Sequence, residues 1–447
     1  MLRVILTALT MTRAGDGLPV KSPTEVGMSS TRLNAIERVV ERGIKAGGYP
    51  GASVIVGRKG AAVFEKGFGK LSWSESSTAV DAQRTIYDIA SLSKVVGTTT
   101  AIMILYDENK IRLDDPVVNY IPTFGGGDKD QVTIRQLLTH TSGLPAGRDI
   151  WRIAQTPLEA RALVLNTPLE GRPGAQYIYS DLGADVLGLL IEVVSGEPLD
   201  KFLTRRVFEP LGMNEPMYRP ADSLRYRIAP TEVTPPRGYP LRGEVHDENA
   251  YALGGVAGHA GLFSTAADLS VFAQMMLNGG EYNGVQIISK PTVELFTSRA
   301  FGHRALGWDT AEGDYGSGRY LGPTAYGHTG FTGTSMWIDP ERAMFVILLT
   351  NRVHAARALR PAKVISDVRA DLSDAAVLSV LDGPKLTAGS KAFRADREVG
   401  WNPPPRASRR RHGSSRHHSI ASATSKSRSS TAKKSSSSKK KSTKKTH

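Results

Sequence analysis

A serine and a lysine three positions apart, Ser91 and Lys94, are the pair of residues in this chain best suited to catalysis. The run that follows them has no proline and is rich in apolar residues, which predicts a largely buried helix. Positions three apart share one face of a helix, so the two side chains would point the same way. A serine hydroxyl is a poor nucleophile at neutral pH, and a neighbouring amine that is partly neutral can take its proton. The spacing therefore predicts a nucleophile and its base.

An isolated serine–lysine spacing is weak evidence, because both residues are common. The alternative is a helix start capped by Ser91, with Lys94 in solvent. Two later segments favour the catalytic interpretation. The first is a turn and a short aromatic stretch ending in YIYSD at residues 177–181, and the second is GHTGF at residues 327–331, which precedes two expected strands.

In this order, the three segments resemble the S-x-x-K helix, Tyr-x-Asn loop and Lys/His-Thr-Gly strand of one superfamily of serine hydrolases. That superfamily contains class C β-lactamases, D-alanyl-D-alanine carboxypeptidases and bacterial esterases, and the resemblance covers about residues 25–381. It implies that Ser91 becomes acylated, that Lys94 assists its deprotonation and that Tyr179 relays the proton. It also implies an oxyanion hole formed by the backbone N–H groups of Ser91 and Phe331.

Two positions depart from the commonest pattern of the superfamily. Asp181 stands where asparagine is usual, and His328, ahead of Thr329 and Gly330, stands where lysine is frequent. Both changes reduce positive potential in the expected cleft, which weakens the binding of the carboxylate that β-lactams and D-Ala-D-Ala peptides carry. Asp181 could instead pair with Lys94, which would raise the pKa of the lysine.

These departures make the reaction class clearer than the substrate. We expect an esterase-like hydrolase that cleaves an ester or amide through an acyl-enzyme. The first alternative is a β-lactamase or D-Ala-D-Ala carboxypeptidase that acts on peptidoglycan. The second is a non-catalytic binding protein on the same fold. No cofactor and no metal are expected, because the histidines lack metal-ligand spacing.

Two further motifs have weaker implications. His140 lies in an HTSG segment that we expect to be structural. A glycine-rich loop around His259 resembles a loop that lines the cleft, but nothing in its sequence indicates catalysis.

The order of the elements predicts an α/β fold of the α+β type. Strand-like runs at both chain ends predict one antiparallel sheet flanked by helices, a sheet lobe formed by about residues 25–90 and 300–381. Residues 91–299 are expected to form a mainly helical second lobe, with the site in the cleft between the lobes. The hydrolase domain would then span residues 25–385.

The charge is unevenly distributed along the chain. The net charge is +14, but residues 401–447 contain 14 Lys and Arg residues and no acidic residue, which leaves the rest of the chain neutral. The Ser/Lys/Arg-rich segment 386–447 is therefore expected to be a disordered tail that could contact a polyanion or an anionic membrane surface. It has no interleaved aromatic residues, which argues against sequence-specific nucleic-acid binding.

The N-terminal segment 1–24 is interpreted as a tail or a weak signal-like segment, because a short apolar run follows Arg3. No segment has the roughly 18 uninterrupted apolar residues that a membrane span needs. A periplasmic or secreted location is favoured over a cytoplasmic one. The chain has no cysteine, which excludes disulfides and thiolate chemistry.

Overall fold

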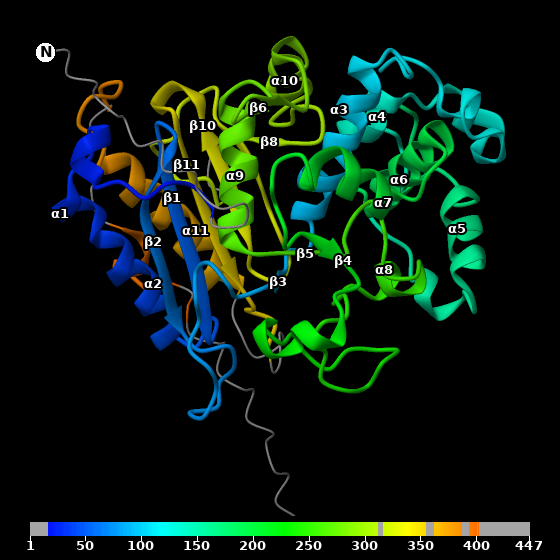
Figure 1. The fold of residues 1–447 in the computed structure, drawn as a ribbon. Coiled ribbons are helices and arrows are strands. Elements are labelled where there is room, and N and C mark those ends of the chain that lie inside the picture. The colour runs from blue at the N-terminus through cyan, green and yellow to red at the C-terminus, as the bar shows by residue number, and fades with distance from the viewer. Residues whose placement is uncertain (1–16, 312–315, 355–361, 387–392, 400, 402–447) are drawn as a thin grey trace, which may run out of the picture. The chain divides into compact units, whose positions relative to one another are not determined.

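A six-stranded antiparallel sheet joins the two ends of the chain (Figure 1). Its strand order is β2-β1-β11-β10-β9-β8, and β1 pairs with β11 in the register Ile55↔Ile347. The strands are β1 (Gly51–Arg58), β2 (Ala61–Gly69), β8 (Asp309–Thr310), β9 (Tyr326–Thr329), β10 (Ser335–Asp339) and β11 (Met344–Thr350). The structure is a computed structural model that describes residues 17–311, 316–354, 362–386, 393–399 and 401. The predicted sheet built from both chain ends is confirmed.

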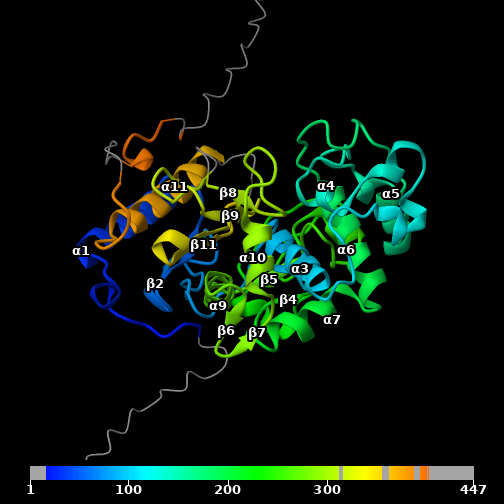
Figure 2. The same cartoon turned by 90° about the horizontal axis from the view of Figure 1, so that it is seen from above.

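Helices cover both faces of this sheet (Figures 1 and 2). On one face lies α9 (Ala266–Leu277), which shares a core with Ile55 and Ile347. On the other face lie α2 (Ala35–Lys45) and α11 (Ala362–Leu378), which share a separate core with Val54 and Val346. Successive residues of a strand point to opposite faces, so each central strand supplies both cores. This explains why β1 and β11 are buried along their whole length.

The second part of the molecule is mainly helical, as predicted. Its α-helices are α3 (Thr100–Asp107), α4 (Ile134–Leu138), α5 (Pro157–Leu165), α6 (Asp181–Ser195), α7 (Leu199–Leu203), α8 (Glu248–Ala252) and α10 (Lys290–Thr297). A small sheet of β3 (Tyr87–Asp88), β5 (Leu262–Ser264) and β4 (Met217–Tyr218) lies beside them, and β6 (Glu281–Tyr282) pairs with β7 (Val285–Gln286). The remaining α-helix is α1 (Ser30–Leu33).

The expected lobe boundary at residue 299 needs a correction. Helix α9 lies within the range assigned to the helical lobe, yet it packs on the sheet. Eleven of its twelve residues are buried, because the sheet covers one side and the helical part covers the other. A helix buried all round shows no amphipathic pattern from which its partner could be predicted.

Both expected ends of the hydrolase domain also need a correction. Leu18 is buried, and Val20 pairs with Ala62, so the ordered domain begins before residue 25. At the other end, Phe393 and Trp401 are buried against the core shared by α2 and α11. The indole N–H of Trp401 donates to Asp367 Oδ2 at 2.8 Å. The segment predicted as a tail from residue 386 therefore includes residues that belong to the domain.

Two expectations fall outside the part of the chain that the structure describes. These are the signal-like run within residues 1–16 and the basic tail after Trp401. Among the described helices, none is long and apolar enough to cross a membrane.

Candidate active site

Ser91 lies at a strand–turn–helix junction between β3 and a helix that begins at Leu92. Ala90 adopts a left-handed backbone conformation, with φ +48°, and its N–H donates to Asp88 Oδ1 at 2.8 Å. Such a conformation costs energy for a residue with a Cβ and is frequent at functional sites. The hydroxyls of Thr332 and Thr334 donate to the carbonyls of Asp88 and Ile89, which ties this junction to the turn after β9.

The predicted helix after Ser91 is present, but its first part has another form. Residues Lys94–Thr99 form a π-helix, and α3 follows directly. A short π-helical segment inside a helix is common at functional sites. The predicted proximity of the Ser91 and Lys94 side chains still holds, since Lys94 Nζ donates to Ser91 Oγ at 2.9 Å.

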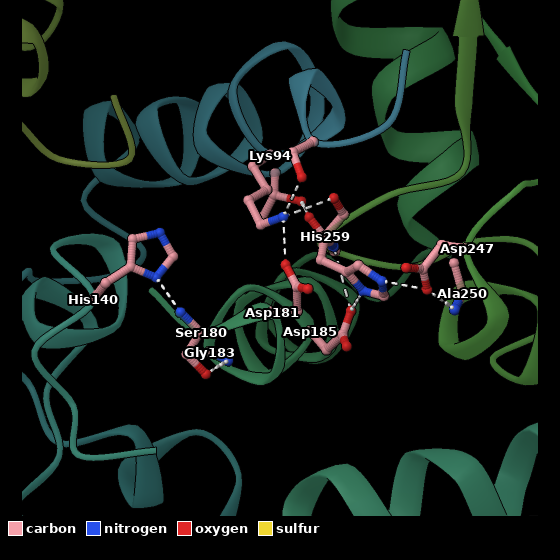
Figure 3. Close-up of polar contacts among 12 residues, drawn as sticks. Lys94, His140, Ser180, Asp181, Gly183, Asp185, Asp247, Ala250 and His259 are labelled. Carbon is pink, nitrogen blue, oxygen red and sulfur yellow. Dashed lines mark hydrogen bonds and ion pairs between the residues drawn. The ribbon is translucent and has the colours of Figure 1, made fainter. Parts of the chain in front are cut away.

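Lys94 is buried, and its amine has three polar contacts (Figure 3). The amine donates to Ser91 Oγ and to the carbonyl of His259 at 3.1 Å, and it forms an ion pair with Asp181 Oδ1 at 2.7 Å. Burial opposes the charge of this amine, but Asp181 and then Tyr179 outweigh burial and raise the pKa of Lys94 above its ordinary value. In the free enzyme Lys94 is therefore an ammonium group. It can hold Ser91 and stabilise negative charge, but it is not a free base.

Tyr179 and Asp181 reach the site from the start of α6, whose N-cap is Ser180. The backbone N–H of Ser180 donates to His140 Nδ1 at 3.0 Å, and the ring of His140 lies 4.5 Å from that of Tyr179. The amine of Lys94 lies 5.0 Å from the Tyr179 ring. His140, predicted to be structural, thus supports the Tyr179 loop. Burial is the main cause that lowers the pKa of His140 well below its usual value, so its ring is neutral.

His328 lies on β9 and is buried. Burial lowers its pKa to about 4, although Asp309 acts in the opposite direction. Its Nδ1 lies 2.8 Å from the carbonyl of Thr329. At neutral pH this ring is uncharged, so it supplies no cation to the site.

Two arginine side chains donate hydrogen bonds to backbone carbonyls of the turn that follows β9. Arg352 donates to the carbonyl of Phe331 at 2.8 Å, and Arg369 donates to the carbonyl of Thr334 at 2.8 Å. At Gly330 a Cβ would lie 2.1 Å from Thr334 Oγ1, so this position requires glycine. These contacts fix the backbone from which Phe331 projects.

A cavity of about 300 Å³ opens beside Ser91. The residues that line it come from the junction at β3, the start of α6, the segment before α8, the loop after α8 and the turn after β9: Asp88, Ala90, Ser91, Tyr179, Asp181, His246, Asp247, Glu248, His259, Ala260 and Phe331. Of the residues predicted for the site, it brings together Ser91, Tyr179, Asp181 and Phe331. Lys94 does not line the cavity but contacts Ser91, Asp181 and Tyr179. His328, Thr329 and Gly330 are not among the described residues that line the cavity.

Sequence reasoning missed Asp247 as a lining residue of this cavity, and it missed the contact that His259 makes with Lys94. The glycine-rich loop was expected to line the cleft, and His259 does so, but its carbonyl also accepts a hydrogen bond from Lys94. The spacing of Asp181 and Asp185 places both on one face of a helix but does not identify the loop that packs there. Among the described residues, no group of three or more His, Asp or Glu side chains is arranged to hold a metal ion.

Comparison with known proteins agrees with this geometry. The family model described as Beta-lactamase matches residues 36–369. The chain belongs to the Beta-lactamase family. A relative from Escherichia coli K12 named "Putative D-alanyl-D-alanine carboxypeptidase" is 33% identical over 397 residues, which is 79% of this chain and 91% of the relative. A protein of the same name from Salmonella agona SL483 is 35% identical over 381 residues, 76% of this chain and 87% of the relative.

Solved structures of the same fold are more distant in sequence. EstCE1, a hydrolase with promiscuous acyltransferase activity, superposes with a TM-score of 0.63 at 22% identity and covers 78% of this chain and 99% of its own. A penicillin-binding protein homologue from Caulobacter crescentus gives 0.62 at 22% identity, with coverage of 79% and 99%. Membership of the Beta-lactamase family, with the serine–lysine pair in contact, makes this chain a serine hydrolase.

Proposed function

We propose that this chain cleaves esters, and more slowly amides, through a covalent acyl-enzyme on Ser91. The observation that carries the proposal is the contact between the buried Lys94 ammonium and Ser91 Oγ at the edge of the cavity. A silent binding protein would have no chemical need for this pair, nor for Tyr179 beside it. The names of the relatives add peptidoglycan-type peptides to the candidate substrates.

The proposed reaction has two halves. Ser91 Oγ attacks the carbonyl carbon of the substrate while its proton passes to the Lys94–Tyr179 pair. Since Lys94 is already protonated, the proton goes to Tyr179, which can receive it only as a phenolate that the neighbouring Lys94 ammonium stabilises. Collapse of the tetrahedral intermediate breaks the bond to the leaving group, which takes that proton. A water then cleaves the ester on Ser91 by the same steps in reverse order.

The charges around Ser91 support esters over substrates that present a carboxylate. His328 is neutral and buried, and the charge of Lys94 is shared with Asp181. A substrate carboxylate would also meet the carboxylates of Asp247 and Asp181 in a small cavity. The oxyanion formed in the reaction would be held by the N–H groups of Ser91 and Phe331, which carry no net charge.

We expect p-nitrophenyl esters of short acids to be hydrolysed with a higher kcat/KM than nitrocefin or a D-Ala-D-Ala peptide. In Asp181→Asn the ratio should move at least about tenfold toward the two carboxylate substrates, since a 1.4 kcal/mol change in electrostatic repulsion is tenfold. The same variant loses the main cause that raises the pKa of Lys94, so its loss of activity at alkaline pH should begin at lower pH. Steady-state kinetics on all three substrates at several pH values tests both effects.

Asp114→Asn is a matched control, because Asp114 is exposed and pairs with Arg135, away from the cavity. It should leave the substrate ratio and the pH profile unchanged. Efficient turnover of nitrocefin with negligible esterase activity would show that the electrostatic argument for esters is wrong.

We also infer that the basic tail binds anionic polymers and is not needed for hydrolysis. A chain that ends at Pro403 keeps Trp401 and should retain the kcat and Tm of the full chain. Its retention on heparin should fall sharply. The retention of the full chain on heparin should weaken as salt is added. A chain that ends at Val399 lacks Trp401, which is 3% exposed, and should lose about 3 kcal/mol of unfolding free energy. Differential scanning calorimetry and heparin chromatography measure these outcomes. A loss of activity in the chain ending at Pro403 would show that the tail folds onto the enzyme.

A further inference from the structure

A cluster of the buried Asp185 and His259 with the partly exposed Asp247 lies next to Lys94 (Figure 3). The ring of His259 has Asp185 Oδ1 at 2.7 Å from Nδ1 and Asp247 Oδ1 at 2.8 Å from Nε2. An ionised carboxylate can only accept hydrogen bonds, so a ring that bonds to two of them carries a hydrogen on both nitrogens. With both carboxylates ionised, His259 is an imidazolium cation held between two anions. Burial raises the pKa of Asp185, and His259 acts in the opposite direction.

The surroundings of this ring favour the charged state. Burial opposes the charge, but Asp185 and then Asp247 outweigh burial and raise the pKa of His259 well above its usual value. In turn, His259 overcomes the effect of burial on Asp247 and keeps the pKa of that carboxyl low. The other titratable groups that act on this cluster include Asp181, next to Asp185 on α6, and His246, next to Asp247. Asp88 and Arg237 also interact with Asp247, and Tyr218 interacts with Asp185.

The backbone at His259 is attached to both helices that carry the proposed catalytic residues. Its N–H donates to Asp185 Oδ1 on α6 at 3.3 Å, and its carbonyl accepts from Lys94 on the π-helix at 3.1 Å. One residue earlier, the carbonyl of Gly258 accepts from Thr98 Oγ1 at 2.6 Å. A Cβ at Gly258 would lie 1.9 Å from the carbonyl oxygen of Ala184, so this loop packs directly on α6.

We propose that His259, held between Asp185 and Asp247, is a positioning residue that aims the amine of Lys94 at Ser91. Lys94 donates to Ser91 Oγ and to the His259 carbonyl, and its charge pairs with Asp181. Fixing the contact with the His259 carbonyl restricts the orientation of Nζ and favours the one in which another N–H points at Ser91 Oγ. Asp247 lines the cavity with its side chain 35% exposed, so the cluster also borders the space that a substrate occupies.

The proposal rests on the proposed function of Ser91, and two variants test it in the full-length chain. His259→Gln keeps the size of the side chain but cannot bond to both carboxylates as a cation. Asp247→Asn removes one anion while it retains the oxygen that accepts from Ala250 N at the start of α8. We expect kcat on a p-nitrophenyl ester to fall about 10–100-fold in His259→Gln, as for residues that orient a catalytic group, and less in Asp247→Asn. KM should change less than twofold in both.

Two readouts distinguish positioning from a purely structural role. The first is the rate at which a fluorophosphonate probe labels Ser91, which should fall in parallel with kcat while Tm stays within a few degrees of that of the parent chain. The second is NMR of the chain with ¹⁵N-labelled histidine. Both ring N–H protons of one histidine should persist from pH 5 to pH 9 and disappear in His259→Gln.

The two proposals can fail separately. If the probe does not label Ser91 in the parent chain, the proposed function is wrong, whereas the NMR experiment still tests the cation. A neutral ring at pH 7, or an unchanged kcat and labelling rate in folded His259→Gln, would overturn the positioning role.

Discussion

Ser91→Ala should lower kcat on the best ester by about 10⁴-fold or more, because it removes the nucleophile of a covalent mechanism. The fold should be unaffected, since the helix begins at Leu92 and its start is attached by the Ser93 hydroxyl, which accepts from Leu262 N at 3.1 Å. KM on the residual activity and Tm are therefore expected to stay near those of the parent chain. Stopped-flow or steady-state hydrolysis, with mass spectrometry of the probe-labelled chain, gives the result directly.

Ser93→Ala is the matched control for this variant. Ser93 is buried two positions away and has a structural partner, so its loss should lower stability more than turnover. If probe labelling survives in Ser91→Ala and disappears in Ser93→Ala, the nucleophile is Ser93, and the proposed mechanism is wrong.

Lys94→Met should be the second most damaging substitution, with kcat about 10³-fold lower. It removes the charge that holds Ser91 Oγ and favours negative charge on the attacking oxygen, an effect that is strong in a buried site. It also leaves Asp181 without its buried partner, which destabilises the fold. Chemical denaturation should therefore show a lower unfolding free energy for Lys94→Met than for Ser91→Ala.

The double variant Lys94→Met/Asp181→Asn separates these two effects. With both charges gone, the unpaired carboxylate no longer costs stability, so the unfolding free energy should recover while kcat stays low. A double variant that recovers both stability and activity would show that Lys94 acts on the fold alone.

The fold was predictable because its patterns are local or repeated. The apolar runs at 51–58 and 344–350 predict buried strands, and their positions at opposite ends of the domain predict a shared sheet. The pairing register Ala52↔Thr350 could not be predicted, because both strands are apolar on both faces and no alternation fixes it. The packing of α9 on this sheet was missed because α9 is also buried on all sides, so its sequence shows no apolar face that identifies its partner.

The site was predictable where a side chain acts through its own type and spacing. Ser91, Lys94 and Tyr179 were selected in this way, and the structure brings them together, while their catalytic roles stay a prediction. Asp181 pairs with Lys94, as one of the sequence-based alternatives required. His259 contributes through its backbone carbonyl and through carboxylates that lie 74 and 12 positions away. Contacts of that kind depend on how α6 and the loop after α8 pack together, and no spacing in the sequence encodes them.

The pairing of β1 with β11 has a consequence for synthesis of the chain. Partners such as Ile55 and Ile347 leave the ribosome far apart in time, and until then β1 and β2 can form only a two-stranded hairpin, which is marginal in water. The turn whose threonines hold the Ser91 junction also belongs to this late segment. Hydrolytic activity is therefore expected only after most of the domain has been synthesised. Until then the helical part of the domain lacks the C-terminal strands on which it packs.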